Sequence, residues 1–152
     1  MRVADIMHRE VVTVRPEETF SGAARVMNDH RVSSLVVVRN DHGAAGVVTE
    51  GDVVAVVAAG LDPGVVRISE RLTRDPATVA PDADLREAAR LMAEHRIRHL
   101  PVVERARVIG IISIRELTRW AVEELTGGHE KPDLDRSSAA LTAAVEVERG
   151  HR

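Results

Sequence analysis

The sequence contains no cysteine and no tyrosine, and its aromatic residues are one phenylalanine and one tryptophan. Without cysteine there can be no disulfide, no thiolate zinc site and no cysteine nucleophile, and the chain is compatible with a reducing compartment. So few rings also argue against the stacking surfaces that bind RNA or single-stranded nucleic acid. The core must therefore consist of Val, Leu, Ile, Ala and Met side chains.

Strong charge of one sign and long apolar runs are also missing. The net charge of the 152 residues is −3, so no basic footprint indicates nucleic acid or an anionic membrane. The apolar runs, such as residues 53–59, are far shorter than the roughly 20 residues of a membrane-spanning helix. The first ten residues include Asp5 and Glu10 and lack the apolar core of a signal peptide. We therefore expect a cytoplasmic protein that contacts neither nucleic acid nor a membrane.

The clearest positive feature is an internal repeat. Residues 3–39 align with residues 68–104, and after the loss of one residue Gly46 aligns with Gly110. The shared residues include Thr-Val at 13–14 and 78–79, Ala-Ala-Arg at 23–25 and 88–90, and His-Arg at 30–31 and 95–96. Two copies are too few for a solenoid, so a tandem duplication of this kind is expected to pack face to face.

Each copy shows the same succession of hydrophobic patterns. In copy one they predict a strand at 11–14, a helix at 19–30, strands at 35–38 and 45–48, and a helix at 50–59. In copy two the equivalent elements are predicted at 77–79, 85–95, 100–103, 108–112 and 114–125. The predicted fold class is α/β (α+β), with two β-α-β-β-α repeats packed about a pseudo-two-fold axis.

The domain boundaries follow from the repeat. Copy one occupies residues 1–60, a linker follows at 61–67, copy two occupies 68–125, and a tail covers 126–152. The linker contains the turn residues Asp62-Pro63-Gly64. The alanine-rich stretch at 138–147 leaves helix and irregular structure equally open for the tail.

Each copy closes with a strand that runs directly into a helix. Thr49 and Asp52 stand at this junction in copy one, and Ser113 and Glu116 stand there in copy two. The N-terminus of a helix presents free N–H groups that can hold a phosphate, and a carboxylate can accept hydrogen bonds from a sugar diol. The same spacing is typical of a capping box, in which the two side chains only satisfy the helix end.

The sequence does not indicate a metal site. His95 and His99 have the spacing of a helical ligand pair, but the helix is expected to end near His95. No cysteine is present and no ordered carboxylate completes a ligand set. We therefore predict no structural or catalytic metal.

Taken together, these marks resemble a tandem pair of CBS domains, also called a Bateman module. They are the openings Val3–Met7 and Ile68–Leu72, the Thr-Val before a Pro, the Met-x-x-His-Arg helix end, the strand at 99–103, and the closing Gly-apolar-apolar-Thr/Ser-x-x-acid. The resemblance extends over residues 3–125. It implies two clefts that bind AMP, ADP, ATP or another adenosyl compound such as S-adenosylmethionine, and a module that often forms a homodimer.

The resemblance also implies the residues of a first cleft, which straddles the two copies. They are Thr49, Asp52, Ala77, Thr78, Val79, Arg98, His99 and Pro101. Asp52 would hold the ribose diol, and Thr49 with the helix N-terminus would hold phosphate. Arg98, and His99 if protonated, would add positive charge, and the backbone at 77–79 would meet the adenine edge.

A second cleft would use the corresponding residues of the opposite copies. They are Val12, Thr13, Ser33, Ser34, Ser113 and Glu116. This set departs from the stronger pattern, because Glu replaces Asp and two serines replace the Arg-His pair. Val36 also stands where copy two has Pro101. We expect this cleft to be weaker than the first, selective for another ligand, or empty.

Three functions remain open on the sequence alone. The first is a regulatory module that senses an adenosyl ligand and requires no cofactor. The second is a structural or interaction module with vestigial clefts and a protein partner. The third is a nucleotide hydrolase, which is disfavoured because no nucleophile is paired with a base and no carboxylates are spaced for a metal. We therefore predict a non-enzymatic sensor.

Overall fold

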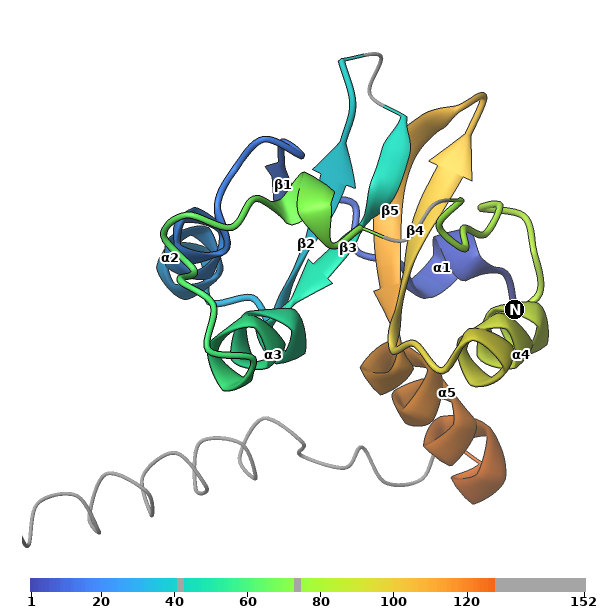
Figure 1. Ribbon diagram of the computed structural model, residues 1–152. Coiled ribbons are helices and arrows are strands. Elements are labelled where there is room, and N and C mark those ends of the chain that lie inside the picture. Colours follow the sequence, from blue (N-terminus) through green and yellow to red (C-terminus); the bar gives the residue numbers. More distant parts are fainter. Residues whose placement is uncertain (41–42, 73–74, 128–152) are drawn as a thin grey trace, which may run out of the picture. The chain divides into compact units, whose positions relative to one another are not determined.

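A computed structural model describes residues 1–40, 43–72 and 75–127 of the chain (Figure 1). Residues 1–117 form one compact unit, and the described residues 118–127 belong to a second. The stretch at 138–147 lies outside the described residues. Among the described residues, no helix is both long enough and apolar enough to span a membrane.

The elements of copy one follow the predicted order. They are α1 (Val3–Ile6), β1 (Thr13–Val14), α2 (Phe20–His30), β2 (Ser34–Val38), β3 (Ala44–Thr49) and α3 (Glu50–Ala58). The Thr19 hydroxyl caps α2 by accepting the N–H of Gly22 at 3.1 Å. The helix ends at Arg31, which adopts the left-handed conformation with a φ of 54°.

Copy two repeats this arrangement. Its elements are η1 (Ile68–Glu70), α4 (Leu85–His95), β4 (His99–Glu104), β5 (Arg107–Ser113) and α5 (Ile114–Thr126). Arg96 ends α4 with a φ of 53°, as Arg31 ends α2. The predicted α/β fold class and the tandem repeat are therefore confirmed, although the boundaries between the domains stay a prediction.

The two sheets differ at their first strand. In copy one, β1 pairs in parallel with β2, and β2 pairs antiparallel with β3. In copy two, β4 and β5 form the antiparallel pair, and the predicted strand at 77–79 is reduced to a single bridge between Val79 and Val102. Proline explains the difference. The N–H of Val36 donates to Val12 at 3.1 Å, whereas Pro101 at the equivalent position has no N–H to donate.

The opening segments are exchanged between the copies, which the sequence patterns did not predict. The N–H of Val3 donates to Ala83 in copy two, and the N–H of Ile68 donates to Glu18 in copy one, both at 2.9 Å. In Figure 1, α1 accordingly lies beside α4. The segment that opens copy one thus completes copy two, and the segment that opens copy two completes copy one.

The hydrophobic core of copy one shows the same exchange. Phe20, Leu35 and Val37 form its centre, and Ile68 from the linker side is buried among them at 1% exposure. Figure 1 shows α2 and α3 on one side of the first sheet, and Val56 of α3 belongs to this core. Ile68 is therefore a core residue of the copy that it follows.

Glycine is required where the exchanged segments meet the sheets. A Cβ on Gly110 would lie 2.7 Å from the sulfur of Met7 and 3.0 Å from the carbonyl oxygen of His8. A Cβ on Gly46 would lie 2.9 Å from a methyl group of Leu72. The glycine that begins each closing motif therefore lets an opening segment approach the strand closely.

Candidate functional site

A cleft of about 500 Å³ lies where the junction of β3 and α3 faces copy two. Five of the eight residues predicted for the first cleft line it, namely Thr49, Asp52, Ala77, Arg98 and His99. The fold brings them together because β3 delivers Thr49 to the start of α3, while β4 begins at His99. We call this the Asp52 cleft.

The other three predicted residues are not part of its lining. Val79 is 4% exposed, and its N–H donates to the carbonyl of Pro101 at 3.0 Å. Thr78 is exposed beside this bridge and Pro101 is buried beneath it. Val79 thus pairs with β4, and the assignment of all three residues as ligand contacts stays a prediction.

Asp52 forms the capping box and keeps a free oxygen. Its Oδ2 accepts the N–H of Thr49 at 2.7 Å and the hydroxyl of Thr49 at 3.0 Å. Within the described part of the chain, Oδ1 has no hydrogen-bond partner. The capping and ligand-binding roles are therefore compatible, since one carboxylate oxygen satisfies the helix end and the exposed second oxygen can accept a further donor.

The Asp52 cleft carries more positive charge than the sequence predicted. Arg71 and Arg96 line it together with Arg98. No salt bridge to these three guanidinium groups is present among the described residues. The acidic groups in the lining are Asp52 and Asp75. An anionic ligand group would therefore be favoured over a cationic one.

Sequence reasoning missed Arg71 and Asp75 because they belong to the exchanged opening of copy two. Arg71 follows η1, which packs on copy one, and Asp75 adopts a left-handed φ of 53°. The signal that could have found them is the repeated opening motif itself, which stands immediately before the predicted first strand of the other copy.

His99 contributes no net charge at neutral pH. Burial lowers the pKa of its imidazole below the ordinary 6.5, and the neighbouring Arg98 lowers the pKa further. Arg98 is thus the cation of the predicted Arg-His pair. His99 offers a neutral donor or acceptor to a ligand, depending on its tautomer.

The remaining walls of the Asp52 cleft are mostly aliphatic. Val47, Val48, Val56 and Ile97 line it. Phe20 also contributes to the lining but is only 2% exposed. A planar base in this cleft would therefore be held mainly by branched aliphatic side chains.

A second and wider cleft of about 1290 Å³ lies beside the junction of β5 and α5. Five of the six predicted residues line it, namely Val12, Ser33, Ser34, Ser113 and Glu116. Thr13 is not in the lining, since it pairs with Val36 in the first sheet. We call this the Glu116 cleft.

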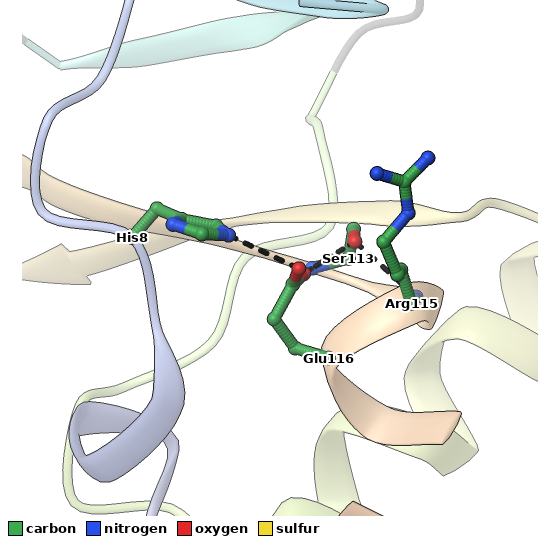
Figure 2. Close-up of polar contacts among 4 residues, drawn as sticks. All are labelled: His8, Ser113, Arg115 and Glu116. Atoms are coloured by element: carbon green, nitrogen blue, oxygen red, sulfur yellow. Dashed lines mark hydrogen bonds and ion pairs between the residues drawn. The ribbon is translucent and has the colours of Figure 1, made fainter. Parts of the chain in front are cut away.

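Glu116 is held on both carboxylate oxygens (Figure 2). Its Oε1 lies 3.0 Å from the Nε2 atom of His8, and its Oε2 accepts the N–H of Ser113 at 2.8 Å. The Ser113 hydroxyl also donates to Oε2. Figure 2 shows His8 reaching this carboxylate from the opening segment, whereas Arg115 extends away from it.

The environment of Glu116 makes it a structural anion. Burial by itself raises the pKa of this carboxyl, but hydrogen bonds from Ser113 and His8 outweigh burial and hold the pKa below the ordinary 4.5. The residue is 8% exposed, whereas Asp52 is exposed. The two carboxylates occupy equivalent positions, yet of the two only Asp52 has an oxygen without a hydrogen-bond partner among the described residues.

Sequence reasoning also missed His8 and its neighbours in the Glu116 cleft. His8, Arg9, Glu10 and Arg31 all contribute to its wall. His8 reaches the cleft because its backbone pairs with Ile111 in β5, with both N–H···O distances at 2.9 Å. This pairing joins residues of opposite copies and has no local sequence signal.

Neither cleft offers a metal site within the range that the structure describes. No group of three or more His, Cys, Asp or Glu side chains is close enough there to hold an ion. His95 and His99 line the same cleft, without a third ligand of that kind beside them.

Comparison with known proteins gives a consistent result. Residues 3–59 and 68–123 each match the CBS domain family. Hypoxic response protein 1 of Mycobacterium tuberculosis is 34% identical over 121 residues, which cover 78% of this chain and 84% of the relative.

Solved structures show the same fold. A putative signal-transduction protein with CBS domains from Burkholderia ambifaria superposes with a TM-score of 0.75 at 31% identity, and the match covers 88% of this chain and 99% of that one. The CBS domain pair of protein MJ0100, solved with 5-methylthioadenosine and S-adenosylmethionine, has a TM-score of 0.74 at 24% identity, over 82% of this chain and 98% of that one. At this identity, the second likeness concerns the fold alone.

Proposed function

This chain belongs to the CBS domain family, and on that premise we propose that it is a regulatory module that binds an adenine nucleotide in the Asp52 cleft. The observation that carries the proposal is that the two carboxylate oxygens of Asp52 have different surroundings. One carboxylate oxygen caps α3 at 2.7 Å from the Thr49 nitrogen, and the other is free to accept a ribose hydroxyl.

The remaining groups of the cleft support a phosphate beside that ribose. The N-terminus of α3 provides a positive dipole end, and Arg98 provides a guanidinium group on the facing wall. The aliphatic residues Val48, Val56 and Ile97 provide an apolar slot for the base. The three unpaired arginines favour AMP, ADP or ATP over the cationic S-adenosylmethionine.

The module acts by binding rather than by catalysis in this proposal. A bound nucleotide would favour one arrangement of the two copies over another, and a cytoplasmic homodimer or an unidentified protein partner would respond to that change. Two CBS-pair ligands of MJ0100, 5-methylthioadenosine and S-adenosylmethionine, share the adenosyl group with this proposal. No cofactor is required for this activity.

A thermal-shift screen tests the proposal directly. AMP, ADP, ATP, S-adenosylmethionine, NAD and GTP would each be titrated against the wild type and Asp52→Ala. We expect one adenine nucleotide to raise the melting temperature of the wild type with increasing concentration, since a ligand that binds the folded state stabilises it. The shift should be lost in Asp52→Ala, because we expect the free energy of nucleotide binding to become less favourable by about 1–3 kcal/mol.

Two controls separate binding from folding. Asp52→Asn keeps an oxygen that can accept the Thr49 N–H, so it should melt close to the wild type while it still binds the nucleotide less tightly. Asp84→Ala removes the cap of α4 away from both clefts and should lower stability without changing nucleotide affinity. A nucleotide shift that persists unchanged in Asp52→Ala would remove the Asp52 cleft as the site.

A second function is favoured by the Glu116 cleft. Both oxygens of its carboxylate are already used by Ser113 and His8, so this cleft lacks the free acceptor on which the sensor proposal depends. A structural or interaction module would therefore follow if the Asp52 cleft also failed to bind. The absence of any thermal shift with all six compounds would support this alternative.

A further inference from the structure

The two clefts share one wall. Thr49, Arg98 and His99 line both the Asp52 cleft and the Glu116 cleft. β3 and β4, which carry Thr49 and His99, pack against each other. The clefts are therefore neighbouring spaces with a common boundary rather than independent sites.

Arg98 is the charged member of this shared wall. His99 is held neutral at pH 7 by burial and by the adjacent guanidinium, and Thr49 carries no charge. No salt bridge binds Arg98 among the described residues. Arg98 is thus the charged residue that lines both clefts, and its guanidinium group can pair with an anion on one side at a time.

The backbone around Arg98 is attached to the floor of the Glu116 cleft. The carbonyl of Arg98 accepts the N–H of Ile114, the first residue of α5, at 2.8 Å. The next residue, His99, pairs directly with Ser113 across β4 and β5. A ligand that displaces Ser113 or the first turn of α5 would therefore also displace the Arg98 backbone.

Charges that line the Glu116 cleft act on His99, a residue of the shared wall. Burial lowers the pKa of His99 most, Arg98 lowers it further, Glu116 opposes this effect and Arg115 adds to it. Arg115 and Glu116 line the Glu116 cleft only, whereas Arg98 lines both. The wall between the clefts therefore responds to the charges of the Glu116 cleft in the free protein.

We propose that anionic ligands in the two clefts oppose each other's binding, because both would use the guanidinium group of Arg98. An anion in the Glu116 cleft would draw Arg98 away from the phosphate position in the Asp52 cleft and would repel that phosphate. Linkage requires the effect to be reciprocal, so a nucleotide in the Asp52 cleft weakens anion binding in the Glu116 cleft equally. This coupling rests on the proposed nucleotide site.

Calorimetric titration of AMP at increasing concentrations of inorganic pyrophosphate tests the coupling, with ionic strength held constant by NaCl. We expect the dissociation constant for AMP to rise about five-fold or more and then level off, since coupling between two sites saturates. If pyrophosphate instead competed with AMP for one site, the apparent dissociation constant for AMP would rise without limit.

Three variants locate the effect. Arg115→Gln removes a cation from the Glu116 cleft alone, so pyrophosphate should affect AMP binding only at higher concentration or not at all. Arg98→Gln should bind AMP more weakly and show no dependence on pyrophosphate. Arg86→Gln, which lines neither cleft, should reproduce the wild-type plateau.

The outcomes separate the coupling from the proposed function. A plateau that is lost in Arg98→Gln and weakened in Arg115→Gln supports the coupling. No effect of pyrophosphate, an unlimited rise, or an unchanged plateau in Arg98→Gln would overturn the coupling while the nucleotide site stands. Failure of AMP, ADP and ATP to bind in the absence of pyrophosphate would overturn both.

Discussion

His8 and Glu116 are separated by 108 positions in the sequence, yet the Nε2 atom of His8 lies 3.0 Å from the Oε1 atom of Glu116. The contact joins the exchanged opening of copy one to the first turn of α5. It supplies the second of the two partners that keep the Glu116 carboxylate ionised while it is buried. This pair therefore adds a side-chain contact to the backbone hydrogen bonds that hold the exchanged segment, and it occupies one oxygen of Glu116.

We expect His8→Ala to lower the free energy of unfolding by about 1 kcal/mol at neutral pH. The buried carboxylate would lose one of its hydrogen-bond partners, whereas the histidine side chain itself is 64% exposed and contributes little by its own burial. Urea denaturation measures the change, with Glu10→Ala as an exposed neighbouring control. Equal stability of His8→Ala and the wild type would show that water replaces His8 without cost.

The lowered pKa of Glu116 predicts a dependence of stability on acid pH. The unfolded carboxyl titrates near 4.5 and the folded one below it, so the stabilisation is present above 4.5 and is lost as pH falls through the folded value. The free energy of unfolding of Glu116→Gln should fall less steeply than that of the wild type between about pH 5 and about pH 3. Parallel curves would mean that Glu116 titrates alike in both states.

His99 has linkage of the same sign, at a higher pH. Its pKa is lowered on folding, so the unfolded state takes up the proton first and stability falls as pH drops below 6.5. An NMR titration of the imidazole, assigned with His99→Gln, should give a midpoint below 6.5. Saturation with AMP should raise that midpoint, because a nearby phosphate favours the imidazolium ion. A midpoint that is unchanged by bound AMP would place the phosphate away from His99.

Two glycine substitutions should change stability in different directions. Gly110→Ala would bring its Cβ to 3.0 Å from the backbone oxygen of His8, so we expect a loss of about 1–3 kcal/mol. Gly51 lies in α3, where a Cβ would meet its nearest neighbour at 3.5 Å, so Gly51→Ala should be neutral or stabilising by up to about 1 kcal/mol. Chemical denaturation of both variants measures the contrast. A Gly110→Ala protein as stable as the wild type would mean that the opening segment shifts freely.

The local patterns predicted the elements well because each depends on neighbours in the chain. The helix over 85–95 was predicted to the residue, and the strands near 35–38 and 100–103 were placed within one residue at their ends. The strand at 77–79 was wrong because its pairing depends on the partner strand. Pro101 lacks the N–H that Val36 provides in copy one, and this is a property of the pair rather than of the segment.

The candidate site was predicted in part. Thr49, Asp52 and Arg98 were assigned to one cleft through the resemblance to CBS-domain pairs, and they do line one cleft. Arg71 and His8 could not be placed, because their positions follow from the exchange of the opening segments. Lowering of the His99 pKa also depends on burial, which no local pattern specifies.

The sequence by itself determined the duplication, the order of the elements and the two strand-to-helix junctions with their acidic residues, since periodicity and turn residues act over a few positions. Only the tertiary structure decided which of the two carboxylates keeps an oxygen available to a ligand. Asp52 remains exposed with a free oxygen, whereas Glu116 is buried and bound by His8. The physical reason is that a carboxylate removed from water must be satisfied by partners, and those partners come from distant parts of the chain.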